Sequence, residues 1–252
     1  MPQPVLLVVA HGSRDPRHAA TVHALARRVA AARPGLRVVT GFLDHCGPSV
    51  PEVVDRLVAE GVREVVALPL FLSRAFHAKA DVPLVLDRAT ADHPGLRLRV
   101  TDVLGPSPLL LDALERRLYE AGLRPGDRCS TGVVLASAGS TDPEAGAVIA
   151  DLARRWQRRA GWLAVRPAFA SAALPRTEDA VRALRAEGVR RIAVAPYVLA
   201  PGFLPDRIER GALDAGADTI ATCLGDAAEL GRLILDRYAS ARSGRLVGAG
   251  RA

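Results

Sequence analysis

Short apolar runs rich in valine, leucine and isoleucine alternate along the chain with longer segments in which apolar residues recur at helical spacing. This alternation is typical of βαβ units, in which helices join the strands of a parallel sheet. The predicted strands are residues 5–10, 37–43, 64–72, 97–104, 132–137, 163–169, 191–199 and 219–223, and the helices predicted in the first half are residues 16–32, 49–60, 79–91 and 107–121. We therefore predict an α/β fold built from parallel sheets with helices on both faces.

The chain is an internal duplication with a constant offset. Residues 59–63 (AEGVR) recur unchanged as residues 186–190, 127 positions later, and the same offset places the Gly-Ser-x-Asp-Pro motif of residues 12–16 on that of residues 139–143 without a gap. We predict two tandem flavodoxin-like lobes, each a four-stranded parallel sheet in the order 2-1-3-4. The predicted boundaries are an N-terminal lobe over residues 1–124, a C-terminal repeat over residues 125–242 and a flexible tail over residues 243–252.

The net charge of +7 comes almost entirely from arginine, since Lys79 is the only lysine. Arginine side chains suit carboxylate and phosphate groups. A nucleic-acid-binding surface would combine basic clusters with stacking aromatic residues, and aromatic residues make up only 4% of this chain, without such interleaving. We therefore expect an anionic small molecule as partner and no nucleic acid. A solvated, arginine-rich surface without any ligand is the alternative.

The cysteines and the apolar runs indicate the cell compartment in which the protein is expected. The cysteines, Cys46, Cys129 and Cys223, are odd in number and lack C-x-x-C spacing, which favours neither a disulfide framework nor a thiolate zinc site. The longest apolar run, residues 65–72, is too short to span a bilayer, and no positively charged segment precedes the apolar residues 5–10. We expect a cytoplasmic protein that does not contact a membrane.

The histidines are confined to the first half of the chain: His11, His18, His23, His45, His77 and His93. His11 follows the first predicted strand and His77 follows the third, whereas the repeat carries no histidine. In a parallel α/β sheet the loops that leave the strands form the ligand crevice, and strands one and three are neighbours in the predicted order. We therefore expect His11 and His77 to face one crevice, with Asp44 and His45 in the same row.

This group of side chains suits metal chemistry. Two imidazoles and a carboxylate bind a divalent first-row metal while leaving coordination positions open, and a neutral imidazole also accepts a proton. The alternative for each histidine is a loop residue whose ring bonds to the backbone. His18 and His23 stand five residues apart on a predicted helix, share no helix face and are expected to be exposed to solvent. His93 precedes a Pro-Gly pair and is expected in a turn.

Absent motifs narrow the function further. The sequence has no G-x-G-x-x-G after the first strand, no Walker loop and no G-x-S-x-G elbow, which argues against dinucleotide and acyl-transfer chemistry. Ser13 and Ser140 stand beside glycine in both copies. Because both halves share them, we expect these serines to have a structural role where the following helix begins.

Several segments resemble the sirohydrochlorin chelatases. They are residues 8–16 (VVAHGSRDP), residues 42–44 (FLD) with the Pro-Ser pair at 48–49, and residues 69–72 (PLFL) followed by residues 76–83 (FHAKADVP). The resemblance extends over both halves, with the specific motifs in the first half and the second as the degenerate copy of a fused, two-lobed, chelatase-like form. It implies a class II chelatase that inserts Fe²⁺ or Co²⁺ into sirohydrochlorin for sirohaem or cobalamin biosynthesis.

The resemblance also implies roles for individual residues. His11 and His77 would handle the metal, which is a substrate and not a permanently bound cofactor. Asp44 would be the catalytic carboxylate, although it stands where the family commonly has the longer Glu. Sirohydrochlorin is a polycarboxylate, and the basic side chains expected to hold it are Arg14, Arg74, Lys79 and Arg207, with Arg17 and Arg176 as further candidates on neighbouring loops.

Two other functions would use the same residues. One is a non-enzymatic carrier of Ni²⁺ or Co²⁺. The other is a module that binds an anionic metabolite, in which the histidines only make hydrogen bonds. Imidazole and carboxylate ligands accept both iron and cobalt, so the residues leave the metal open. The duplication is compatible with a monomer and with a homodimer.

Overall fold

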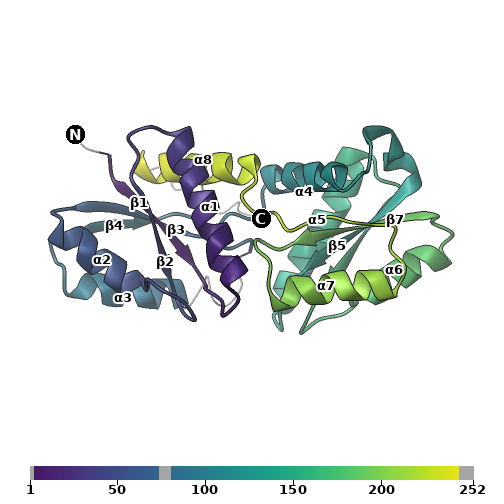
Figure 1. Cartoon of the computed structure of the whole chain (residues 1–252), viewed down its shortest axis with the longest axis horizontal. Coiled ribbons are helices and arrows are strands. Elements are labelled where there is room, and N and C mark those ends of the chain that lie inside the picture. Colours follow the sequence, from purple (N-terminus) through teal and green to yellow (C-terminus); the bar gives the residue numbers. More distant parts are fainter. Residues whose placement is uncertain (1–2, 74–80, 244–252) are drawn as a thin grey trace. The chain divides into compact units, whose positions relative to one another are not determined.

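The computed structural model describes residues 3–73 and 81–243. They form two compact units, the first from the described residues up to 105 together with 226–243, and the second from residues 106–225. Each unit contains a four-stranded parallel sheet flanked by helices (Figure 1), which confirms the predicted α/β fold and the duplication. Within the described ranges no helix is long and apolar enough to cross a membrane.

The sheet of the first unit has the predicted order, β2-β1-β3-β4. Its strands are β1 (Val5–Ala10), β2 (Val38–Phe42), β3 (Glu64–Pro69) and β4 (Arg97–Val100). Every residue of β1 is buried, because this inner strand is covered on both faces of the sheet. All pairs are parallel, so the carboxyl ends of the strands meet at one edge of the sheet.

Helices cover both faces of this sheet (Figure 1). They are α1 (Pro16–Ala32), α2 (Val50–Ala59), α3 (Val82–Ala91) and α8 (Ala228–Arg242). On one face α2 and α3 pack together, and Leu57 and Leu86 from these helices join Leu7 of β1 in one buried apolar cluster. On the other face lie α1 and α8, which contact each other. The first unit is therefore a three-layer sandwich around a central sheet.

The second unit repeats this plan, with the sheet order β6-β5-β7-β8. Its strands are β5 (Thr131–Ser137), β6 (Ala164–Phe169), β7 (Arg191–Tyr197) and β8 (Thr219–Ile220), and its helices are α4 (Pro108–Glu120), α5 (Pro143–Ala160), α6 (Thr177–Ala186) and α7 (Phe203–Asp214), with a short 3₁₀ helix, η2 (Pro125–Ser130), before β5. Val134, Leu184 and Ile208 belong to its buried apolar cluster. The two copies thus share one strand order.

The two copies exchange their last helices between the units. Helix α4 ends the first copy in sequence but belongs to the second unit, where it contacts β7. Helix α8 ends the second copy but belongs to the first unit, where it contacts α1 and β3. The chain therefore passes between units at 105–106 and 225–226, and not at the predicted 124–125. An apolar helix stripe records that a helix is buried, not which of two similar sheets covers it. Residues 244–252 of the predicted tail lie outside the described residues.

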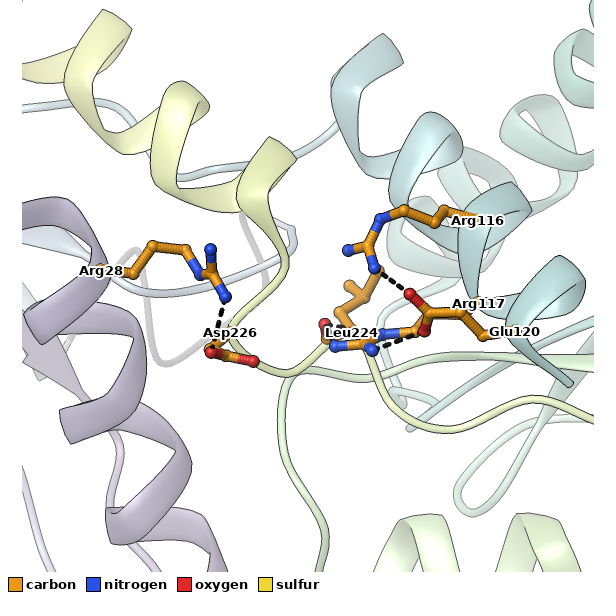
Figure 2. Close-up of polar contacts among 6 residues, drawn as sticks. All are labelled: Arg28, Arg116, Arg117, Glu120, Leu224 and Asp226. Atoms are coloured by element: carbon orange, nitrogen blue, oxygen red, sulfur yellow. Dashed lines mark hydrogen bonds and ion pairs between the residues drawn. The ribbon is translucent and has the colours of Figure 1, made fainter. Parts of the chain in front are cut away.

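Polar contacts hold each exchanged segment within its own unit (Figure 2). In the first unit, Arg28 of α1 pairs with Asp226, just before α8, at 3.1 Å. In the second unit, the guanidinium of Arg117 in α4 donates two hydrogen bonds to the carbonyl oxygen of Leu224, at 2.9 and 3.3 Å. Charged donors make strong hydrogen bonds to partly buried carbonyl groups. Leu224 is thus held in the second unit, and Asp226, two residues later, is held in the first unit.

Several strands end earlier than their apolar runs. β3 ends at Pro69, before the predicted residue 72, and β4 ends at Val100, before the predicted residue 104. The residues that follow still face the core, since Leu70 is 5% exposed and Leu104 is fully buried. Loops that close over a core contribute apolar residues just as strands do, so the sequence pattern overestimates strand length.

Candidate active site

Backbone hydrogen bonds join the loops that follow β1 and β2. The N–H of Leu43 donates to the carbonyl oxygen of Ala10, and the N–H of Asp44 donates to that of His11, both at 2.9 Å. Backbone hydrogen bonding between the two segments therefore continues beyond the strand ends, as far as Asp44. It places the half-buried His11 next to the exposed Asp44 at the carboxyl edge of the sheet, as the sequence predicted.

Gly12 allows these loops to approach closely. Its φ is +96°, and a Cβ atom added there would lie 1.8 Å from the carbonyl oxygen of Asp44. Only glycine combines that backbone conformation with the absence of a side chain. The contact explains why glycine directly follows His11, and it fixes the histidine relative to the β2 loop.

The start of α1 confirms a structural role for the serine that follows this glycine. The hydroxyl of Ser13 accepts a hydrogen bond from the N–H of Asp15 at 3.0 Å, and the carboxylate of Asp15 accepts one from the N–H of Arg17 at 2.9 Å. The second copy repeats the first of these bonds between Ser140 and Asp142 at 3.1 Å. Both serines thus shape the turn into the next helix.

His45 stacks on His11. The two ring centroids lie 5.9 Å apart and the ring planes differ by 7°. The backbone of His45 has a φ of +66°, a left-handed conformation that turns its side chain back toward the β1 loop. One oxygen of the Asp44 carboxylate accepts a hydrogen bond from the N–H of His45 at 2.7 Å, and the other lies 3.6 Å from its Nδ1. Asp44 therefore orients His45, whose place at the site the sequence left open.

His18 and His23 correct the prediction of exposed helix residues. Both are half-buried, because the buried ring of Phe42 at the end of β2 packs against each of them. Its centroid lies 6.5 Å from that of His18 and 5.7 Å from that of His23, and the latter contact is edge-on. Helical spacing describes which side chains share a face, but not what lies opposite them.

His18 also belongs to the electrostatic surroundings of His11. Burial lowers the pKa of His18, and the charge of a protonated His11 lowers it further, whereas Asp15 acts in the opposite direction. Two imidazolium ions close together are unfavourable. The helix that follows the first strand thus adds an imidazole with a lowered pKa to the neighbourhood of His11, which its spacing in the sequence did not indicate. Only five residues separate the end of β1 at Ala10 from the start of α1 at Pro16, and this short connection could have indicated that His18 lies near His11.

His93 lies in the loop between α3 and β4, which confirms the predicted turn. Its Nε2 lies 2.6 Å from the Oδ1 atom of Asp55 in α2. This loop leads into the amino end of β4, at the edge of the sheet opposite His11. His93 is therefore separate from the candidate site.

The remaining predicted residues are placed as follows. Arg14 is exposed in the loop after β1, and Arg207 is exposed on α7 of the second unit. His77, Arg74 and Lys79 lie outside the described residues. Among residues 3–73 and 81–243, no three histidine, cysteine or acidic side chains gather as a set able to hold a metal ion. The described part of the site thus offers two stacked imidazoles and an orienting carboxylate, and not a closed metal-binding cage.

The second copy keeps the shape of this loop pair without its chemistry. Gly139 has a φ of +90°, and a Cβ atom there would lie 1.9 Å from the carbonyl oxygen of Ser171. The N–H of Ser171 donates to the carbonyl oxygen of Ala138 at 3.0 Å, and Ala172 has a φ of +59°. The fold therefore requires neither the two histidines nor the aspartate at these positions.

The model of one protein family, CbiX, matches residues 5–121 and 132–241. The chain belongs to the CbiX family of sirohydrochlorin chelatases. The curated relatives of this CbiX-family chain include the sirohydrochlorin cobaltochelatase of Priestia megaterium, 27% identical over 209 residues that cover 81% of this chain and 67% of the relative. They also include the sirohydrochlorin ferrochelatase of the same organism, 23% identical over 188 residues that cover 73% of this chain and 70% of the relative.

Solved structures agree with the fold of this CbiX-family chain. SirB from Bacillus subtilis with Fe³⁺ superposes with a TM-score of 0.84 at 23% identity, covering 97% of this chain and 98% of SirB. SirB from Bacillus subtilis subspecies spizizenii in complex with cobalt gives a TM-score of 0.80 at the same identity and coverage. These superpositions establish the chelatase-like, two-lobed fold.

Proposed function

We propose that this CbiX-family protein is an enzyme that inserts a divalent metal, Fe²⁺ or Co²⁺, into sirohydrochlorin. The observation that carries the proposal is the stacked pair of His11 and His45, oriented by Asp44 at the carboxyl edge of the first sheet. Parallel α/β sheets bind ligands at this edge. The family match supports the substrate, and the names of the relatives include both metals.

Metal insertion requires a metal that has lost part of its water shell, and it requires removal of the two pyrrole N–H protons. A neutral imidazole has one free lone pair, with which it either binds the metal or accepts one proton. Two imidazoles therefore divide these tasks, with His11 as one of them, and the protons pass on to solvent. An incomplete ligand set leaves coordination positions open, so the metal can pass on to the tetrapyrrole nitrogens. We propose His77 as the second member of the metal-handling pair, from the sequence.

Asp44 acts on this site as a positioning residue. Its carboxylate is engaged with the backbone N–H of His45 and lies near the Nδ1 atom of the same residue. The shorter side chain, compared with a glutamate, keeps the carboxylate close to its own loop. In this role Asp44 sets the orientation of His45, and through ring stacking it limits the movement of His11.

Arginine side chains supply the binding of the polycarboxylate substrate. Arg14 follows His11 by three residues and is exposed, and Arg207 is exposed in the first turns of α7. Guanidinium groups match carboxylates in geometry and charge. We propose that these two residues, together with Arg74 and Lys79, hold peripheral carboxylates and leave the chemistry at the ring centre to the histidines.

The test is metal insertion followed in the visible spectrum. The protein is incubated without oxygen with sirohydrochlorin and Fe²⁺, and separately with Co²⁺, and the rate is compared with the spontaneous rate. Turnover above that rate supports the proposal. Stoichiometric metal binding without turnover would instead indicate the Ni²⁺ or Co²⁺ carrier, and tetrapyrrole or other anion binding with no metal dependence would indicate the binding module.

A further inference from the structure

A cavity of about 490 Å³ lies on the first unit, between α1, α2 and the edge strand β2. Its β2 side runs from Arg37 to Thr40, whereas the candidate active site begins beyond the end of this strand, at Asp44. None of the stacked histidines or their orienting aspartate lines it. A cavity of this volume is in the range that accepts small organic molecules.

The lining of this cavity is strongly basic. Arg27 comes from α1, Arg37 stands just before β2, and Arg56 comes from α2, so exposed arginines from three segments line one cavity. Among the described lining residues Glu60 is the one carboxylate, and it pairs with Arg37 at 2.5 Å. The arginines thus exceed the acidic groups by two, and their charges repel one another unless an anion lies between them.

The rest of the lining combines a polar pair with apolar walls. The hydroxyl of Thr40 and the Nδ1 atom of His23 lie 3.1 Å apart, within hydrogen-bond distance. Aliphatic side chains complete the walls: Ala26, Ala30, Val53 and Leu57. Val53 and Leu57 are only 2% and 1% exposed and belong to the core, so the surface open to a ligand comes mainly from the polar side chains and from the half-buried Ala30.

The internal duplication provides a comparison within the same chain. The second copy has the same sheet order, so residues at equivalent positions occupy the same place in the fold. At the offset of 127, however, most of the polar lining is replaced: His23, Arg37, Thr40 and Arg56 correspond to Ala150, Ala164, Pro167 and Ala183, and only Arg27 keeps a basic counterpart, Arg154. The second copy also has Arg166 at the position of Val39, where it pairs with Glu187 at 2.9 Å, but it lacks counterparts of Arg37 and Arg56. The fold therefore does not require these two arginines.

We propose that this cavity binds a small organic anion that bears at least two carboxylate or phosphate groups. Arg37, just before β2, and Arg56, on α2, bind its charged groups, and Arg27 adds a third cation. This site is separate from metal insertion, so it does not rest on the proposed function.

Two probes distinguish the chemical class of the anion. Citrate carries carboxylates and inorganic pyrophosphate carries phosphates, and binding of each to the full chain is measured by isothermal titration calorimetry. The test variant is Arg37→Ala with Arg56→Ala, which installs the residues that the second copy has at these positions. The matched control is Arg154→Ala with Arg182→Ala, which removes the same charge from exposed positions of the second unit.

We expect saturable binding of at least one probe by the unaltered protein, weakened at least about tenfold in the test variant and unchanged in the control, because each lost guanidinium removes charge-assisted hydrogen bonds. The tighter probe assigns the anionic group. Nuclear magnetic resonance of the unaltered protein should place the perturbed signals at His23 and Thr40, a readout that does not depend on the variants folding. Equal weakening in both variants, perturbations confined to other residues, or no saturable binding of either probe would overturn the proposal.

Discussion

The imidazole rings of His11 and His45 lie within 7° of parallel, with centroids 5.9 Å apart, although the two residues follow different strands. The backbone conformation of His45 and the carboxylate of Asp44 produce this stacking. It joins the β1 and β2 loops into one structure at the carboxyl edge of the first sheet.

The first prediction concerns the ring of His45. Replacing it with Ala or with Asn should reduce metal insertion several-fold, because His11 loses its stacking partner. Asn tolerates the left-handed backbone, and Ala172 occupies the same conformation in the second copy, so both variants should fold. Near-normal rates for both would mean that the His45 ring does not contribute; loss with Ala and recovery with Asn would assign the effect to the backbone.

For His11, substitution by Ala should reduce metal insertion at least about tenfold, equivalent to about 1.4 kcal/mol of transition-state stabilisation. The lost group is the proposed metal ligand or proton acceptor. His93→Ala serves as the control, because His93 lies at the opposite edge of the sheet and should leave the rate unchanged. Full activity of His11→Ala above the spontaneous rate would disprove the metal-handling role.

Gly12→Ala should destabilise the first unit by about 3 kcal/mol or more, since the new Cβ would collide with the Asp44 carbonyl oxygen in a backbone conformation that disfavours side chains. Gly35→Ala is the matched control. Gly35 also has a positive φ, of +83°, but nothing lies within 4 Å of an added Cβ, so its cost should be only about 1 kcal/mol. Urea unfolding measures both, and equal losses would contradict the proposed steric contact.

The depressed pKa of His18 predicts a dependence of stability on pH. The unfolded side chain takes up a proton near its ordinary value of 6.5, whereas the folded one does so only at lower pH. Between these values the unfolded state binds more protons, so the free energy of unfolding falls as the pH drops below about 6.5 and levels off below the folded pKa. In His18→Gln this loss should shrink. Urea unfolding at several pH values tests the slope, and a nuclear magnetic resonance titration of His18 tests the pKa; a value at or above 6.5 would contradict the prediction.

Arg207→Ala should raise KM for sirohydrochlorin more than it lowers kcat. A residue that holds a peripheral carboxylate contributes equally to binding of the substrate and of the transition state, and its loss appears as weaker binding. Arg210→Ala, one turn further along α7 and also exposed, removes the same charge and should leave both constants close to normal. A defect confined to kcat would place Arg207 in the chemical step instead.

Much of the architecture could be predicted because it depends on local patterns. The alternation of apolar runs and helical segments predicted both sheets, and the constant offset predicted that they would share one strand order. Glycine beside His11 and aspartate before the helix proline marked the turn at the end of β1. These features rest on the period of side chains along one element and on the conformations open to single residues.

The sequence by itself thus determined the strand order, the duplication and the place of His11 at the end of β1. The tertiary structure alone decided which sheet covers α4 and α8, that His45 stacks on His11, that Phe42 partly buries His18 and His23, and that arginines from three elements share one cavity. The physical reason is that a sequence pattern indicates which side chains are buried, but not which side chains they contact. Those contacts depend on the shapes of the side chains, on backbone conformations such as the φ of His45, and on packing between segments far apart in the chain.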